Sequence, residues 1–336
     1  MNYSHEHTKK NLLSVSKTTK SILFLALLTI AGATLFSSCF KHKNNAQLDA
    51  NIDQHNKDAN EYKSELDQAD NDINNALSDI PAFGKTENGA EILSSPLCGC
   101  TIDSTDIANK ILYFNFDGVT PCFSPSVTRS GQIKVQLTSG VHWSDAGAVL
   151  TETFTNYKIT RLSDNKSIMF NGVKTLENIA GHNWLTFLTS QSTFYHRERA
   201  FNVDVTFDNN QHATWNSART TEWSYVQAGG GIPYARVAFE ANGDTSVNGY
   251  NTVDSWGTNR FGSTFTTYYN APVNSNTYCG LWRFSSGELV HHVDNNDFTL
   301  TLGVDQNGNP STLSCAYGFK VEWSNGNSNY DVVLSY

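Results

Sequence analysis

The sequence is poor in several residue types that many globular proteins use freely. Charged residues make up only 16% of its 336 residues, and it contains two methionines and seven prolines. Aromatic residues reach 12%, and Thr, Ser, Asn and Gly are frequent. This balance is typical of an all-β protein outside the cytoplasm. The formal net charge of −9 disfavours a nucleic-acid partner, because binding the phosphate backbone requires a basic surface.

The sequence also lacks the short motifs that mark common enzyme classes. It has no G-x-S-x-G, H-E-x-x-H, phosphate-binding loop or dinucleotide fingerprint. We therefore predict no catalytic residue, no cofactor and no metal ligand. Glycoside hydrolysis needs two acids at a set separation in a cleft, which sequence alone does not reveal. The acids that lie among predicted strands are Glu152, Asp204, Glu222 and Glu240.

The N-terminus has the pattern of a lipoprotein signal peptide. Basic residues precede an uncharged stretch of 16 residues, 21–36, which is short for a membrane span and suits a signal peptide. Ser37 and Ser38 then precede Cys39, as cleavage by a lipoprotein signal peptidase requires. We predict a signal peptide over residues 1–38 and a lipid anchor on Cys39. The alternatives are a plain secretory signal with an incidental cysteine, or a retained membrane anchor.

The residues after Cys39 bear on location. Residues 40–43 read Phe-Lys-His-Lys, whereas surface-exported lipoproteins usually carry acidic residues there. We therefore expect a cell-envelope protein whose partner is the membrane, through lipidated Cys39, and which faces the periplasm. Residues 39–45 form the predicted tether.

Residues 46–80 are predicted to form an acidic helix. The segment from Gln47 to Ile80 has no Gly or Pro, and apolar or small residues recur in it with a period of seven. These residues are Leu48, Ile52, His55, Ala59, Tyr62, Leu66, Ala69, Ile73, Ala76 and Ile80. The period fits a helix that packs along a partner or folds back on its own domain. We interpret it as a solvated helix or tether holding the body off the membrane, with a coiled-coil oligomerisation stalk as the alternative.

Residues 98–336 are predicted to form an antiparallel β body, joined to the helix by a linker over 81–97. Apolar and polar residues alternate in 133–138, 201–208, 298–304 and 330–336, and Asx-rich turns separate such runs. The expected fold is all-β, a large antiparallel sheet or sandwich-like body preceded by an N-terminal helical segment. The body forms either one assembly or two halves, 98–195 and 196–336.

Five cysteines lie in the body, where an oxidising compartment allows disulfides. We predict the pairs Cys279–Cys315 and Cys100–Cys122, which leaves Cys98 over. The Cys98-Gly99-Cys100 motif could instead be read as a metal or redox pair, but no second motif or neighbouring His supports this.

Three further patterns could indicate a ligand site but are explained at least as well by a structural role. His291 and His292 are adjacent in an alternating strand and so point to opposite faces, which disfavours a shared metal ion. The runs 294–297 and 305–309 are rich in Asp and Asn, as hairpin turns are, and lack the closing acid of a calcium loop. All seven tryptophans lie in the β body, where some could form a platform for sugars.

Several segments resemble a group of uncharacterised Bacteroidota envelope lipoproteins. They read KILYFNFDG, CFSPSVTRSGQIKVQLTSG, GAVLTETFTNYKI, FNGVKTLENI, ATWNSARTTEW and SWGTNRFGSTFTT, together with the segments around Cys279 and Cys315. The resemblance implies an all-β body on a lipid anchor and carries over no catalytic residue. We expect a non-catalytic protein with a structural or interaction role and a glycan or envelope-protein partner. A carbohydrate-binding module is the alternative, and a glycoside hydrolase is the third reading.

Overall fold

The computed structural model describes residues 50–78, 80–84, 97–122, 126–181, 193–226, 236–280, 283–313, 315–324 and 328–336, which belong to one compact unit. The predicted signal peptide, Cys39 and the tether lie outside the described residues. Within the described ranges, no helix is both long enough and apolar enough to cross a membrane.

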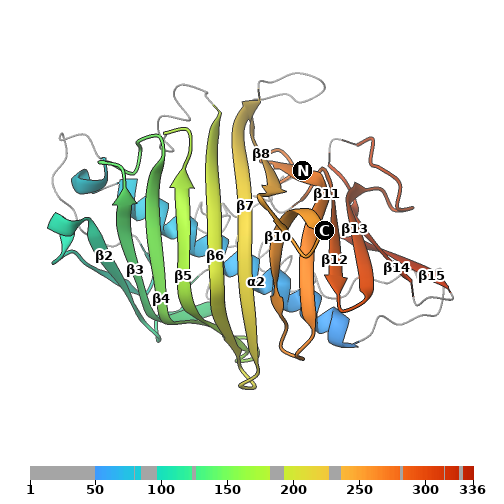
Figure 1. Ribbon diagram of the computed structural model, residues 1–336, viewed down its shortest axis with the longest axis horizontal. Helices are drawn as coiled ribbons and strands as arrows, with labels where there is room; N and C mark the ends of the chain where they lie inside the picture. Colours follow the sequence, from blue (N-terminus) through green and yellow to red (C-terminus); the bar gives the residue numbers. More distant parts are fainter. Residues whose placement is uncertain are drawn as a thin grey trace, which may run out of the picture. The chain divides into compact units, whose positions relative to one another are not determined.

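The described chain is a mostly β protein with one long helix ahead of fifteen antiparallel strands, which confirms the predicted fold class (Figure 1). Helix α2 spans Ala50–Ser78, and two short 3-10 helices, η1 and η2, span Pro81–Phe83 and Ile107–Asn109. The first strands are β1 Cys100–Asp103, β2 Ile111–Asp117, β3 Val127–Ser139, β4 Ala148–Arg161, β5 Ser167–Asn178, β6 Phe194–Phe207 and β7 His212–Val226. The remaining strands are β8 Arg236–Gly243, β9 Thr245–Val247, β10 Tyr250–Thr258, β11 Thr264–Asn276, β12 Ser286–Val293, β13 Asn296–Val304, β14 Gly318–Ser324 and β15 Asn329–Ser335.

The strands form one sheet that follows chain order from β1 to β7 and again from β10 to β15. Between these runs, β7 pairs with both β10 and β8, and β11 also pairs with both, which closes a small four-stranded barrel. Of the two arrangements left open by the sequence, the structure has the single assembly. Strand β6 runs without a break through the boundary expected between residues 195 and 196.

A row of bulges bends the sheet across β3 to β6. The strand register shifts at 130/132, 154/157, 171/173 and 200/203. Asn156 and Asn202 adopt left-handed backbone conformations there, and each donates its backbone N–H to the side-chain oxygen of another asparagine, Asn171 or Asn216, at 2.8 Å. A Cβ on Gly131 would lie 2.1 Å from the Asn156 carbonyl oxygen, so this position requires glycine. Because bulges bend a strand and increase its twist, an aligned row of them curves the sheet.

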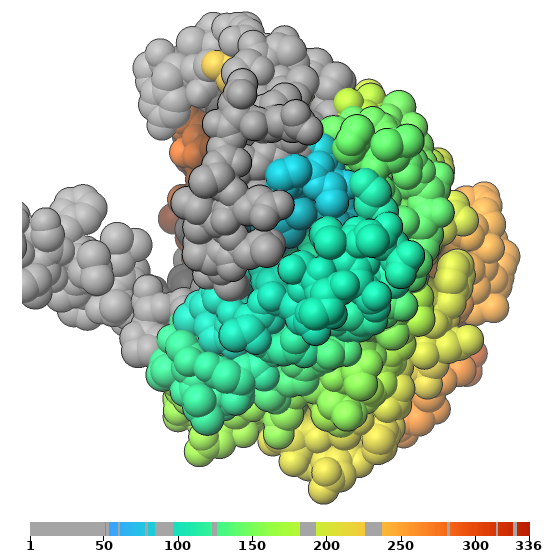
Figure 2. Space-filling model, turned by 90° about the vertical axis from the view of Figure 1, so that its left-hand side faces the viewer, coloured from blue at the N-terminus to red at the C-terminus, as the bar shows by residue number. Residues whose placement is uncertain are grey.

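Helix α2 packs on one face of this sheet, which we call the inner face; the opposite face is the outer face. Tyr62, Leu66, Ile73 and Leu77 are buried in the same core as strand residues such as Phe170. The helix crosses the strands obliquely in Figure 1, and Figure 2 shows the strands following one another in a curve from teal through green to yellow.

The predicted seven-residue period is confirmed, and the helix folds back on its own domain, so the interpretation as a solvated helix or tether is wrong. Leu48 lies outside the described residues, and of the seam residues whose side chains are described all but Ala59 are buried: His55, Tyr62, Leu66, Ala69, Ile73, Ala76 and Ile80. These side chains pack against the protein's own sheet, so the helix does not hold the body away from an anchor. The face that would pair with a second copy in a coiled coil is already covered.

One disulfide differs from the prediction. Cys279 pairs with Cys315 as expected, but Cys122 pairs with Cys98, and the expected Cys100–Cys122 bond is wrong. Cys100 begins β1, where strand pairing places it opposite Phe116 and turns its side chain into the core. Cys98 lies in the turn before β1, with its Cα 5.7 Å from that of Cys122. The two disulfides indicate an extracytoplasmic protein.

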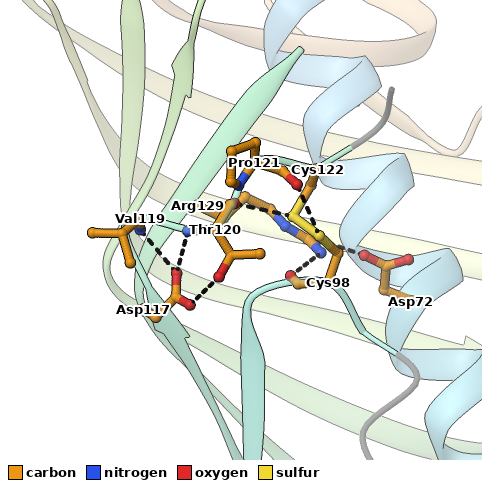
Figure 3. Close-up of a disulfide and its surroundings, with 8 residues drawn as sticks. All are labelled: Asp72, Cys98, Asp117, Val119, Thr120, Pro121, Cys122 and Arg129. Carbon is orange, nitrogen blue, oxygen red and sulfur yellow. Dashed lines mark hydrogen bonds and ion pairs between the residues drawn. A yellow bond between two sulfur atoms is a disulfide. The ribbon is translucent and has the colours of Figure 1, made fainter. Parts of the chain in front are cut away.

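Figure 3 shows that the Cys98–Cys122 disulfide lies beside a link between the helix and the sheet. Arg129 donates a hydrogen bond to the Cys98 carbonyl oxygen at 3.1 Å and forms an ion pair with Asp72 of α2. Asp117 orders the loop before Cys122 by accepting hydrogen bonds from the backbone N–H groups of Val119 at 2.8 Å and Thr120 at 2.9 Å. The disulfide therefore holds the turn whose carbonyl oxygen accepts from Arg129, next to the Arg129–Asp72 pair.

Candidate functional site

The acidic side chains of α2 meet basic side chains that project from the inner face of the sheet. Four aspartates of the helix each form an ion pair with a different cation. The pairs are Asp58 with Arg260, Asp67 with Arg219, Asp70 with Lys174 and Asp72 with Arg129. The cations come from the turn after β10, from β7, from β5 and from β3. We call these four pairs the helix–sheet ladder.

The Asp58–Arg260 pair closes the ladder near the start of α2. The Arg260 Nε and Nη2 atoms donate to the two carboxylate oxygens of Asp58, both at 2.6 Å. The guanidinium lies 3.5 Å from the ring centroid of Phe207; the Asp58 side chain is buried, and that of Arg260 is 9% exposed. Burial raises the pKa of Asp58, and the hydrogen bonds from Arg260 oppose this rise. A bidentate, stacked pair of this kind fixes the position of the helix.

The middle of the ladder extends into a larger charged group, the central cluster. Its members are Asp67, Asp70, Glu152, Lys174, Glu198 and Arg219. Lys174 is fully buried and lies 3.2 Å from Glu152, which is also fully buried. Arg219 Nη2 donates to Glu198 at 2.9 Å, and the Ser217 hydroxyl donates to Glu198 at 3.2 Å.

The acids of the central cluster outnumber its cations, and the pKa values reflect this excess. Burial acts to lower the pKa of Lys174, but Asp70, Glu152 and Glu198 outweigh it and raise that pKa. Burial also acts to raise the pKa of Glu198, and the charges of Arg219 and Lys174 overcome it and lower the pKa to about 2. Burial and then the charge of Glu152 raise the pKa of Asp70. Lys174 and Arg219 are therefore the charges that hold the cluster together.

The cluster also contains a group of acids that could hold a metal ion by spacing alone. Carboxylate oxygens of Asp67, Asp70 and Glu198 lie within 4.8 Å of one another. Arg219 and Lys174 already supply positive charge at the same oxygens. We therefore interpret the three acids as part of an ion-pair network rather than a metal centre.

Of the four acids named as hydrolase candidates, Glu222 and Glu240 lie side by side, and Glu152 and Asp204 lie at two other places. Glu152 is buried on the inner face. Asp204 is exposed beside His212, at 3.3 Å. Glu222 and Glu240 face each other across β7 and β8, and Glu240 is exposed. The sheet separates Glu152, which lies beneath α2, from the acids of the outer face.

The histidine and Asx patterns are as predicted. His291 is buried on the inner face, whereas His292 faces outward, with Nδ1 2.6 Å from an oxygen of Asp297. The Asp305 carboxylate accepts hydrogen bonds from the backbone N–H groups of Asn307 at 2.8 Å and Asn309 at 3.0 Å, which is an Asx-rich turn.

The tryptophans divide between the core and the outer surface. Trp143 and Trp215 are buried, and the Trp143 indole N–H donates to Asn74 of α2 at 2.6 Å. Trp256 is partly exposed, and its ring centroid lies 6.0 Å from that of Phe201, a side chain that is 55% exposed. Trp184 and Trp282 lie outside the described residues.

A shallow hollow of about 260 Å³ lies elsewhere on the outer face of β4 to β6. Its lining residues are Val149, Thr175, Glu177, Arg197 and Arg199. Arg197 pairs with Glu177 at 2.9 Å, and Arg199 pairs with Asp244 at 2.7 Å. Each guanidinium therefore already has a carboxylate partner, and the hollow has no unmatched positive charge for an anionic ligand.

Sequence reasoning missed the cations of the ladder, although a signal for them exists. In β4, Glu152 has the same parity as the inward-facing Leu150 and Phe154. Arg219 has the same parity as inward-facing Trp215 in β7. When a charged residue stands at a position where the alternation of the strand expects an inward-facing apolar side chain, its charge is buried and needs a partner. The nine acids of residues 46–80 were the available partners.

Comparison of this chain with protein-family models, with curated proteins and with solved structures finds no match. The features that bear on function are therefore the N-terminal sequence and the geometry of the inner and outer faces.

Proposed function

We propose that this protein is a lipid-anchored cell-envelope protein with a non-catalytic, structural or interaction role. The observation that carries the proposal is the occupation of the inner face by α2. The curved side of the sheet, where many β proteins hold a small molecule, is filled by the protein's own helix and sealed by the helix–sheet ladder. Contacts with partners would then use the outer face and the loops, which suits an interaction protein.

The anchor and the location depend on the N-terminal sequence and the disulfides. Basic residues, 16 uncharged residues and Ser-Ser-Cys lead to Cys39. Two acyl chains hold a protein on a membrane stably, at about 0.8 kcal/mol per buried CH2 group. The basic residues that follow Cys39 favour the periplasmic side.

Fatty-acid labelling tests the anchor directly. We expect cells to incorporate a radioactive fatty acid into the wild-type protein and not into Cys39→Ala, which should also leave the membrane fraction. Cys100→Ala is the matched control, since it removes a different cysteine and should be labelled normally. Equal labelling of wild type and Cys39→Ala would contradict the proposal that Cys39 carries the lipid anchor.

A second candidate function is glycan binding, favoured by the exposed aromatic pair on the outer face. Phe201 and Trp256 present apolar rings to solvent, and such rings stack on sugars. If this candidate is right, binding on a glycan array should weaken at least tenfold in Phe201→Ala. The control Phe261→Ala removes another exposed Phe, in the turn after β10, and should bind like wild type. Absence of any array signal for wild type would favour the structural role.

A further inference from the structure

Two buried histidines join the start of α2 to the sheet. His55 lies on α2 and His291 on β12, and their rings stack with centroids 4.4 Å apart and planes inclined by 26°. His55 has no exposed surface, and His291 is 4% exposed. The contact lies one helical turn before the Asp58–Arg260 pair, at the end of α2 that the central cluster does not reach.

The surroundings of the two rings are mainly aromatic. The ring of Phe265 lies 4.8 Å from that of His55, and the ring of Trp215 lies 5.8 Å from it. His291 Nδ1 shares a hydrogen bond of 2.6 Å with the Thr267 hydroxyl. Both ring nitrogens of His55, and Nε2 of His291, have no hydrogen-bond partner among the described residues. An imidazolium at this position would therefore lack an acceptor for its charge.

The charged groups near the stack are already engaged. On α2, the Asp58 carboxylate accepts from Gln54 and from Arg260, which projects from the turn after β10. On β12, His292 faces outward and pairs with Asp297 of β13. The neighbouring strands β7 and β11 contribute Trp215, Phe265 and Thr267 to the contact, none of which is charged. Among the described side chains, no carboxylate is therefore placed to neutralise a protonated ring.

We propose that the His55–His291 stack is an acid-sensitive latch that, on protonation of either ring, releases the first turns of α2 and opens the inner face beside β7, β11 and β12. A single imidazolium in this site would be a buried charge without a hydrogen-bond acceptor among the described residues, so a ring that takes up a proton must move out of the contact. The later part of α2 stays in place, because the pairs of Asp67, Asp70 and Asp72 hold it independently.

The pH range follows from the titration of the rings. Burial lowers the pKa of His55 from 6.5 to about 4, and burial, followed by the charges of His55 and His292, lowers that of His291. The latch therefore stabilises the docked helix fully above pH 6.5 and loses this contribution as pH falls towards 4. Asp58 and Glu61 act in the opposite direction, because burial raises their pKa values and favours the docked, protonated state in acid. A variant that removes only the histidine separates the two effects.

Hydrogen exchange read by mass spectrometry tests the latch in the full chain. After correction for the pH dependence of intrinsic exchange, we expect opening of residues 50–62 to increase about thirtyfold from pH 7.5 to 5.0 through His55 alone. Residues 66–77 should change little. His55→Phe keeps an aromatic ring but cannot titrate, so it should remove most of the increase. His212→Phe is the control, since His212 is exposed beside Asp204 and should behave like wild type.

Two results would overturn the latch. One is a rise in exchange of the same size in wild type and His55→Phe, or no rise in wild type. The other uses wild type alone and so does not depend on how the variant folds: both buried rings would titrate with midpoints near 6.5 in an NMR titration, without any opening of residues 50–62. Midpoints well below 6.5 that coincide with opening would support the latch.

Discussion

At the scale of single residues, the inner face contains two fully buried charges, Lys174 and Glu152. Lys174 is fully buried between Asp70 and Glu152, and its removal would leave two carboxylates without their main cation. Breaking a buried pair costs more than the pair contributes, because the remaining charge stays desolvated.

We predict that Lys174→Met lowers the free energy of unfolding by about 3–5 kcal/mol. Urea unfolding with the disulfides intact measures it. Lys134→Met, the same change at a partly exposed position of β3, should cost less than about 1 kcal/mol. Equal losses in the two variants would show that the buried charge network contributes little to stability.

The sequence does not predict which individual residues contact each other across the fold. The alternation in β4 predicts which residues face inward, and Glu152 is among them. It does not predict that Lys174 on β5 and Asp70 on α2 meet it, because the chain between Asp70 and Lys174 must first fold. The cysteine error has the same origin: Cys98 and Cys100 differ by two residues, and only the start of β1 decides which one points inward.

At the scale of elements, α2 is an acidic helix whose stability depends on pH in more than one way. Glu65 is partly exposed on α2, and burial, followed by the nearby charge of Glu61, raises its pKa to about 7. A raised pKa in the folded state means that this side chain contributes stability below its unfolded pKa of 4.5, and the contribution is lost as pH rises through about 7.

We predict that Glu65→Gln stabilises the protein at pH 8, by about 1–2 kcal/mol after allowance for its partial exposure, and has little effect at pH 4. Thermal unfolding across this pH range provides the measurement. Glu240→Gln makes the same chemical change at an exposed position on the outer face and should give no such pH-dependent gain. A gain for Glu65→Gln that is equal at both pH values would contradict the assignment.

The elements themselves were predictable to different extents. The seven-residue period of α2 and the alternation of the strands are local patterns, and the structure follows both. The bulges at Asn156 and Asn202 depend on side chains of neighbouring strands, so a single run of sequence does not reveal them. The curvature that lets α2 pack on the sheet therefore could not be predicted from the sequence. Without it, the sequence alone favours the interpretation of the helix as a tether.

At the scale of the whole molecule, two disulfides close loops at opposite ends of the sheet. Cys98–Cys122 ties the turn before β1 to the loop after β2, and Cys279–Cys315 ties the segment after β11 to the one before β14. Each bond constrains the unfolded chain, which typically stabilises a protein by about 2–4 kcal/mol.

We predict that Cys122→Ser lowers stability by about 2–4 kcal/mol and makes Cys98 reactive to a thiol reagent, while Cys279–Cys315 stays intact. Peptide mapping without reduction identifies the bonds. Cys100→Ser should leave the Cys98–Cys122 peptide unchanged. Recovery of a Cys100–Cys122 peptide from the wild-type protein would contradict the pairing in the structure.

The positions of the ladder pairs along the chain also suggest the order in which they form during folding. A chain made from its N-terminus presents α2 before any of its partners, and the ladder pairs then close loops of increasing length. The sequence separations are 57 for Asp72–Arg129, 104 for Asp70–Lys174, 152 for Asp67–Arg219 and 202 for Asp58–Arg260. Because short loops close before long ones, we expect docking to proceed from the C-terminal end of α2 towards its N-terminal end as successive strands join the sheet. We expect the His55–His291 stack, which needs β12, to form last, so acid release would reverse only the final step of folding.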